Sequence, residues 1–407
     1  MVAAVRQGAS QRAVARRFGV SLDTVQRWVW RAADQRLDRV DWTDRSDRPH
    51  RSPRSTSLRV EEAVLAVRRA LKEQSALGEY GAAAIRRELL LGTPGTGTRQ
   101  ALPVPGVPSV ATIGRILSRR GAVDHRRRIR RHAPPPGWYL LDAAAGRVEL
   151  DSFDVVEGLA IRGSTGGAAP ARGSKPPVHL DVLTGVSLHG GLVAAWPVAA
   201  VSARQVVDAL VAHWRAVGLP TYAQFDNDNR FAGPRQHPDA IGRVIRLCLS
   251  LDVTPVFAPP SEHGFQAAIE GFNGRWQAKV WARFEHESLA ALQRQSAKYV
   301  TASRHRAAVR VDSAPPRRPF PAEWRLDLQA PPRGHIVFLR RTNQRGAVSV
   351  LGHTFAVATT WPHRLVRCEV DLDGGTLRVY ALRRREPTSQ PLLCAHPYQL
   401  PRRHFKE

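Results

Sequence analysis

The chain has 407 residues, of which 43% are hydrophobic and 24% are charged, so it is long enough to form several domains. Its 61 Lys and Arg residues outnumber 35 Asp and Glu residues, and the formal net charge of +26 predicts a polyanionic partner. Three widely separated cysteines exclude a disulfide framework, and no apolar run is long enough to span a bilayer. With no visible signal peptide, we expect a reducing, cytoplasmic setting and no membrane partner.

The first forty residues carry the pattern of a helix-turn-helix, which we expect to form a DNA-binding domain over 1–40. Ser10 and Ser21 can each cap a helix, and Gly19 permits the turn between the two helices. Apolar residues at helical spacing form one stripe, made of Val14, Ala15, Phe18, Val25, Trp28 and Val29. The second helix is expected to enter the major groove and to contact DNA through Thr24, Gln26, Arg27 and Arg31. The segment resembles the N-terminal helix-turn-helix domains of bacterial transposases and homeodomain-like regulators.

A second helical DNA-binding unit is expected over residues 58–121, after a linker rich in Arg, Asp, Ser and Pro. Three segments with helical apolar spacing follow one another, around Val64, Ile85 and Ile113. Ser109 is a suitable cap for the last of them, which we expect to read DNA.

A basic linker is expected over residues 122–137, where arginines crowd together before a run of prolines. Because such a segment joins DNA-binding units to a presumed catalytic core, we expect its arginines to contact phosphates. They are Arg126, Arg127, Arg128, Arg130 and Arg131.

Residues 138–310 show three strand patterns followed by alternating helices and strands. The strands are expected at 147–156, 178–183, 188–196, 221–226 and 254–258, and the helices at 202–217, 241–251 and 266–284. A Gly- and Pro-rich loop is expected between the first two strands. This order predicts an α/β core of the RNase H-like class, a mixed sheet with helices on its faces.

Residues 333–407 contain short alternating apolar segments separated by glycine turns. This pattern predicts a small all-β domain, an SH3-like barrel whose arginines would contact the DNA backbone. A stabilising or dimerising cap is the alternative function for this domain.

Three carboxylates in the core carry the expected chemistry: Asp151 and Asp226 at strand ends, and Glu270 on a helix. If strands one and four are neighbours, as in the RNase H-like order, Asp151 and Asp226 converge on one site. Carboxylate oxygens suit Mg²⁺ or Mn²⁺, and a two-metal site can activate an attacking hydroxyl while stabilising the leaving oxygen. Lys279 and Arg283, on the helix of Glu270, are expected to contact the substrate.

Other residues compete for these roles. Asp154 is an alternative for the first ligand, because it also lies on the first strand, and Asp228 is an alternative for the second. We interpret Asp181 as a turn or sheet-end acid and His263 as a loop residue that could contact DNA.

The motifs around these acids resemble those of the retroviral-integrase-like DDE transposases of bacterial insertion sequences. The resemblance rests on Val-Glu-Leu-Asp151, Phe-Asp226-Asn-Asp-Asn-Arg-Phe231 and Glu270-Gly-Phe-Asn273. It implies that Asp151, Asp226 and Glu270 bind divalent metal. It also implies that water first frees a 3′-hydroxyl at each element end, which then attacks target DNA, and that a homo-oligomer pairs two ends. The chain departs from the family at Asp228, Arg230 and Gln266, where Gly, Glu and Asn are usual.

The resulting hypothesis is a transposase that binds element ends, cleaves double-stranded DNA and transfers the strand to a target. It would act in the bacterial cytoplasm, on the nucleoid. Two other functions remain open: a non-catalytic DNA-binding regulator derived from a transposase, and an RNase H-like nuclease that cleaves without joining.

Overall fold

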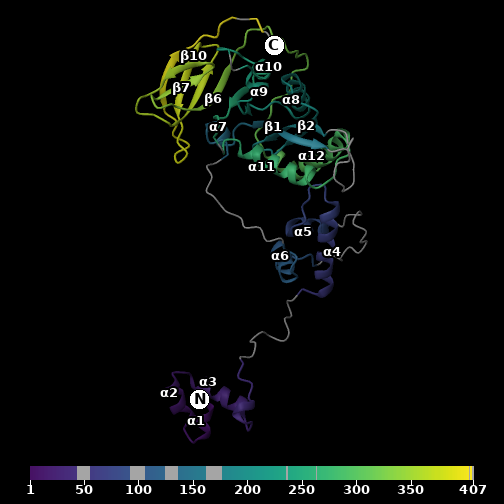
Figure 1. The fold of residues 1–407 in the computed structure, drawn as a ribbon, viewed down its shortest axis with the longest axis vertical. Coiled ribbons are helices and arrows are strands. Elements are labelled where there is room, and N and C mark those ends of the chain that lie inside the picture. The colour runs from purple at the N-terminus through teal and green to yellow at the C-terminus, as the bar shows by residue number, and fades with distance from the viewer. Residues whose placement is uncertain are drawn as a thin grey trace. The chain divides into compact units, whose positions relative to one another are not determined.

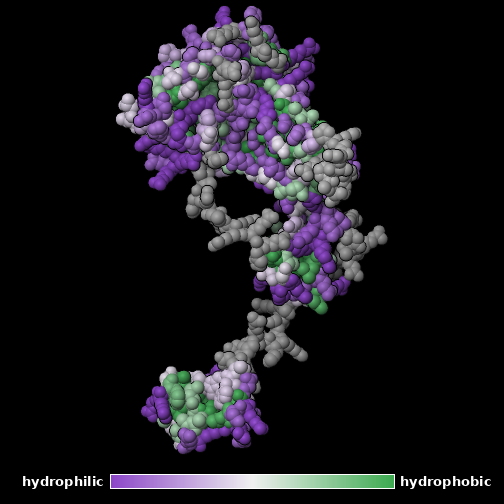
Figure 2. All heavy atoms as spheres, viewed as in Figure 1, coloured by the Kyte–Doolittle hydropathy of each residue, from purple (hydrophilic) through white to green (hydrophobic). Residues whose placement is uncertain are grey.

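In the computed structural model the chain divides into two compact units, residues 1–61 and residues 62–407. The described residues are 1–43, 56–91, 106–123, 136–161, 177–234, 237–262, 264–402 and 404–405. Hydrophilic residues cover most of the visible face of the part that holds the core sheet (Figure 2). Of the helices in these described ranges, none combines the length and the apolar character that a bilayer crossing needs.

The smaller unit contains the predicted helix-turn-helix. The Ser10 side chain accepts a hydrogen bond from the Ala13 amide, and Ser21 does the same for Thr24, so both expected caps are formed. Gly19 ends the first of these helices with φ 63°, a conformation that glycine adopts without strain. The helices are α1 (Val2–Arg6), α2 (Gln11–Phe18) and α3 (Leu22–Ala32), followed by a 3-10 turn, η1 (Leu37–Arg39).

Three more helices form a small bundle of their own. Val64, Ile85 and Ile113 are fully buried at its centre, one from each helix, and Ser109 caps the third helix through the Thr112 amide. The helices are α4 (Leu58–Gln74), α5 (Ala82–Leu91) and α6 (Val110–Arg119). The predicted helical unit is therefore present, and DNA binding by it stays a prediction.

The core sheet has the predicted RNase H-like strand order. Its first five strands lie in the order β3-β2-β1-β4-β5, in which β1, β2 and β3 are antiparallel and β4 and β5 run parallel to β1. Strands one and four are thus neighbours, as expected. The bounds are β1 (Leu150–Ile161), β2 (Val178–Ser187), β3 (Val193–Val198), β4 (Tyr222–Phe225) and β5 (Thr254–Phe257). The expected loop between the first two strands lies largely outside the described residues.

Helices cover both faces of this sheet (Figure 1). One face packs on α8 (Ala203–Val217), α9 (Asn229–Ala232) and α10 (Arg243–Ser250), around Phe153 and Trp214. The other face packs on α11 (Ala267–Trp276), a π-helical turn η2 (Gln277–Trp281) and α12 (Leu289–Asp312), around Val156 and Phe272. A short helix, α7 (Leu141–Ala144), precedes β1. Each side chain of β1 therefore points to one of two different helical layers.

The C-terminal strands are all-β as predicted, but they continue the core sheet. Strand β6 pairs in parallel with β5, matching Val256 with Val337 and Phe257 with Phe338, and the order then runs β6-β9-β10-β11. Strands β7 and β8 form a separate hairpin. The bounds are β6 (His335–Arg341), β7 (Ala347–Val350), β8 (His353–Ala356), β9 (Leu365–Asp371), β10 (Thr376–Ala381) and β11 (Leu392–Pro397). The sheet edge left by the core is thus covered by the C-terminal part.

Candidate active site

Strand β1 carries two aspartates that face opposite sides of the sheet. Because side chains alternate along a strand, residues three positions apart point in opposite directions. Asp151 shares the side of Phe153, whose ring packs edge-on against Trp214 of α8. Asp154 shares the side of Val156, which packs in the cluster formed with α11 and α12. The fold therefore separates the two candidates for the first ligand.

Asp151 is buried and held in an ion pair. Its side chain is 1% exposed, and both carboxylate oxygens accept hydrogen bonds from the Arg317 guanidinium, one of them at 3.0 Å. The indole nitrogen of Trp214 donates to Asp151 Oδ2 at 3.1 Å. The structure thus places this carboxylate with Arg317 and Trp214, and does not bring it together with Asp226 and Glu270 as the sequence led us to expect.

Asp154 lies on the face of β1 that packs against α11, the helix of Glu270. Burial raises the pKa of its carboxyl to about 6, and the negative charges of Asp226 and Glu270 contribute to that rise. Asn273 Nδ2 donates to Asp154 Oδ2 at 2.7 Å. Three carboxylates from β1, the end of β4 and α11 therefore share one electrostatic environment.

Asp226 directly follows β4, the strand that pairs in parallel with β1. Its Oδ1 atom accepts a hydrogen bond from the Asp228 amide at 3.0 Å, which fixes the turn after the strand. Asp228 has a different role, because it caps α9 and accepts two bonds from Arg230, at 2.8 and 2.9 Å. Asp228 is therefore engaged in the cap of α9.

Glu270 lies in the first turn of α11 and is exposed, as a ligand that must reach metal and DNA would be. Ile269 and Phe272 on the same helix are buried against the sheet. Asn273, one turn further on, is also buried, and its Oδ1 atom accepts a hydrogen bond from the Thr184 hydroxyl at 2.8 Å. The helix is thus fixed to β1 and β2 beside the acids.

These three carboxylates suit a divalent cation because they offer oxygen donors and negative charge. Repulsion from two carboxylates contributes to the high pKa of Asp154, and a bound cation would relieve that repulsion. In the described part of the chain, however, no three His, Cys, Asp or Glu side chains lie close enough together to share one ion.

Asp181, another acidic candidate, has partners of its own. Asp181 accepts a hydrogen bond from the Val201 amide at 3.0 Å and lies 3.8 Å from Arg230, in keeping with a sheet-end acid. His263 lies outside the described residues.

The expected DNA contacts on α3 divide into two pairs. Gln26 and Arg27 are exposed, and Arg27 pairs with Asp23 at 2.8 Å across one helical turn. The Thr24 hydroxyl lies 2.8 Å from that of Ser21, inside the helix cap. Arg31 has a side chain that is only 12% exposed. It lies over the Trp28 ring and 3.5 Å from Asp41. Thr24 and Arg31 therefore support the fold of this unit.

The arginines of the basic segment, for which DNA contacts were also expected, lie outside the described residues. They are Arg126, Arg127, Arg128, Arg130 and Arg131.

Lys279 and Arg283 bind protein carbonyls, where substrate contacts were expected. Lys279 Nζ donates to the Gly78 carbonyl at 2.9 Å, and Arg283 donates to the Lys72 carbonyl at the same distance. The residues that follow the Glu270 helix are thereby bonded to the last turn of α4 and to the segment after it.

The sequence does not predict the roles of two residues that organise the site. Helical spacing places Asn273 on the same side as Glu270, one turn further on, but it does not indicate the bond to Asp154. Arg317 lies in a Pro- and Arg-rich stretch, and no local pattern connects it with β1.

Comparison with known proteins supports the helix-turn-helix. Residues 1–39 match the family described as a homeodomain-like domain. No curated protein matches the chain. The catalytic core domain of BIV integrase is 15% identical, with a TM-score of 0.25, over 38% of this chain and 81% of that one. A chain of the simian T-cell lymphotropic virus intasome in complex with PP2A regulatory subunit B56 gamma is 14% identical, with a TM-score of 0.30, over 76% of this chain and 91% of that one. At these TM-scores neither structure adds to what the strand order shows, and the homeodomain-like match concerns the N-terminus alone.

Proposed function

We propose that this protein is a metal-dependent DNA strand-cleaving and strand-transfer enzyme, a DDE transposase whose ligands are Asp154, Asp226 and Glu270. One observation carries the proposal: Asp154 on β1 and Asp226 after the neighbouring parallel strand β4 lie in a sheet with the RNase H-like strand order, where the charges of Asp226 and of Glu270 on α11 both act on the Asp154 carboxyl. The helix-turn-helix at residues 1–39 and the net charge of +26 supply the binding of DNA that such chemistry requires.

The residues of the site have separate tasks in this proposal. Asp154 would hold the metal from β1 and Asp226 from the turn after β4, and Glu270 would complete the set from α11. Asn273 orients the Asp154 carboxylate through its 2.7 Å hydrogen bond. Mg²⁺ or Mn²⁺, when bound, activates the attacking water or 3′-hydroxyl and stabilises the leaving oxygen. Asp151 serves the fold, because its charge is already matched by Arg317.

Binding of duplex DNA is assigned to the helix-turn-helix and to the basic segment at 125–132. Cleavage at two element ends followed by joining needs two active sites, so we expect a homo-oligomer that acts on chromosomal DNA in the cytoplasm. The cysteines, which are free in the structure, suit a reducing setting.

The test is a cleavage and strand-transfer assay on DNA that carries the ends of the element, with Mg²⁺ or Mn²⁺. Asp154→Asn, Asp226→Asn and Glu270→Gln should each abolish both products while leaving end binding intact. Full activity in any of the three variants would remove that residue from the site.

A non-catalytic DNA-binding regulator is the second candidate, and one observation favours it. Among the described residues, no three acids lie close enough together to share an ion. A regulator would bind the ends without metal-dependent cleavage, and a simple nuclease would cleave without forming a joined product.

A further inference from the structure

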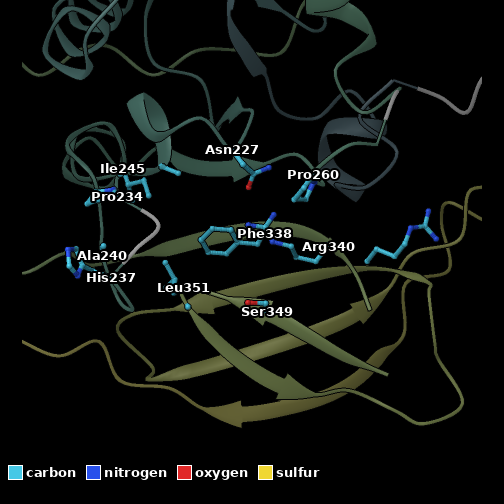
Figure 3. A pocket seen from close by; sticks show the side chains of 14 residues that line it. Asn227, Pro234, His237, Ala240, Ile245, Pro260, Phe338, Arg340, Ser349 and Leu351 are labelled. Atoms are coloured by element: carbon cyan, nitrogen blue, oxygen red, sulfur yellow. The ribbon is translucent and has the colours of Figure 1, made fainter. Parts of the chain in front are cut away.

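A cavity of about 500 Å³ lies beside the Asp226 turn, between the core and the C-terminal strands. Asn227 and Pro260 line it from the core, and Phe338, Arg340 and Ser349 line it from β6 and β7 (Figure 3). Its volume falls in the range of about 300–1,000 Å³ that holds small organic ligands. It is separate from the carboxylates but begins one residue after Asp226.

The side chains that line the cavity include cationic groups and an aromatic ring. Arg340 and Arg341 contribute guanidinium groups and His237 an imidazole, and none of the described lining residues is acidic. The Arg340 guanidinium lies over the Phe338 ring, 4.9 Å from its centroid. Arg341 forms an ion pair with Glu262, so its charge is shared with the protein. Such a wall suits a ligand that has both a planar ring and a negative charge.

A nucleotide combines these two properties. Its base can stack on the Arg340 guanidinium, which the buried Phe338 ring supports from below, and its phosphate can lie near the arginine side chains. A duplex is too wide to enter a cavity of this volume, so the nucleotide must be unpaired. Because Asn227 adjoins Asp226, a strand whose phosphodiester lies at the carboxylates has its next nucleotides within reach of the cavity.

We propose that this cavity receives one unpaired nucleotide of the DNA strand that is processed at Asp154, Asp226 and Glu270. The inference rests on the proposed function, since that function brings a strand to Asp226. In this proposal, the junction of β6 and the core holds an unpaired strand end during cleavage. The energy of opening the duplex end would be offset by stacking and phosphate contacts.

The test uses the full chain, without divalent metal, and a labelled single-stranded thymidine oligonucleotide containing 4-thiothymidine. Irradiation should crosslink the oligonucleotide to peptides that contain residues 338–341 or 349–352. Ser349→Trp fills the cavity from an exposed strand position and should weaken binding by at least about fivefold, the loss of one stacked base. Thr360→Trp, at an exposed position that does not line the cavity, is the matched control and should bind as the wild type does.

Equal binding by the Ser349→Trp and Thr360→Trp variants, or crosslinks confined to other peptides, would overturn the proposal. So would binding of thymidine 5′-monophosphate in the cavity without any crosslink from the oligonucleotide. A specific crosslink in a protein that never cleaves DNA would refute the proposed function and keep the cavity assignment.

Discussion

The side-chain amide of Asn273 donates a hydrogen bond to the Asp154 carboxylate at 2.7 Å, and so joins the helix of Glu270 to the first core strand. The other end of the same amide accepts a bond from Thr184 on β2. Because both ends of Asn273 are engaged, its orientation is fixed, and that of Asp154 with it.

Replacing Asn273 should therefore impair cleavage by misplacing Asp154. We expect Asn273→Ala to reduce the cleavage rate by about tenfold to a hundredfold, the usual effect of losing a residue that orients a ligand. The variant should also need more Mg²⁺ for half-maximal activity, measured by a metal titration. Gln277→Ala, at an exposed position one turn further along the helix axis, is the control. Wild-type metal dependence in Asn273→Ala would show that the hydrogen bond does not position Asp154.

The ion pair of Asp151 with Arg317 should matter for stability. Asp151→Asn leaves the Arg317 charge largely buried without its partner, at a cost of about 3–5 kcal/mol in the free energy of unfolding. Urea denaturation measures this change. Asp154→Asn should not lose stability and is expected to gain some, because it removes a charge that burial and two neighbouring carboxylates disfavour. A double variant with Arg317→Met should recover much of the loss, and no recovery would argue against a specific pair.

Acid should weaken the fold through His213, which is buried in α8. Burial lowers the pKa of His213 to about 4, from an ordinary value of 6.5. Since the folded pKa is the lower one, the unfolded chain binds the proton first. The associated stability is therefore complete above pH 6.5 and is lost as the pH falls towards 4. The shift corresponds to about 3 kcal/mol at most.

The measurement is the difference in unfolding free energy between the wild type and His213→Gln across that pH range. Comparing the two proteins cancels the titration of the carboxylates, including the opposite effect of Asp154. The difference should shrink as the pH falls from 6.5 to 4. A constant difference would mean that His213 does not titrate in this way.

Two arginines of α3 should have separable effects on DNA binding. Arg27→Ala should weaken binding to duplex ends and reduce the slope of log affinity against log salt by about one, because an exposed cation that contacts a phosphate is lost. Arg31→Ala should instead lower the melting temperature, since Arg31 packs over Trp28. An unchanged salt slope in Arg27→Ala would exclude phosphate contact by that residue.

Local patterns were enough to predict most of the elements. Apolar periodicity and caps predicted α2, α3 and α6, where Ser10, Ser21 and Ser109 form the expected hydrogen bonds. The succession of strands and helices predicted the RNase H-like order. The pairing of β5 with β6 was not predictable, because which strand covers a sheet edge depends on tertiary packing across a long intervening segment.

The first metal ligand shows the same limit. Alternation along β1 indicates that Asp151 and Asp154 face opposite sides, but it does not say which side carries Glu270. That choice depends on which residues pack on each face of the sheet. Trp214 and Arg317 donate hydrogen bonds to Asp151, whereas Asn273 donates one to Asp154. The motif Val-Glu-Leu-Asp151 favoured the residue that the structure places in a buried ion pair.

The most direct measurement is the metal-dependent cleavage of element-end DNA by Asp154→Asn and Asp151→Asn, each assayed at a temperature where circular dichroism shows a folded chain. We predict that folded Asp154→Asn gives no cleaved or joined product, whereas folded Asp151→Asn retains activity despite its lower stability. Activity in Asp154→Asn together with a folded but inactive Asp151→Asn would contradict the assignment of the site.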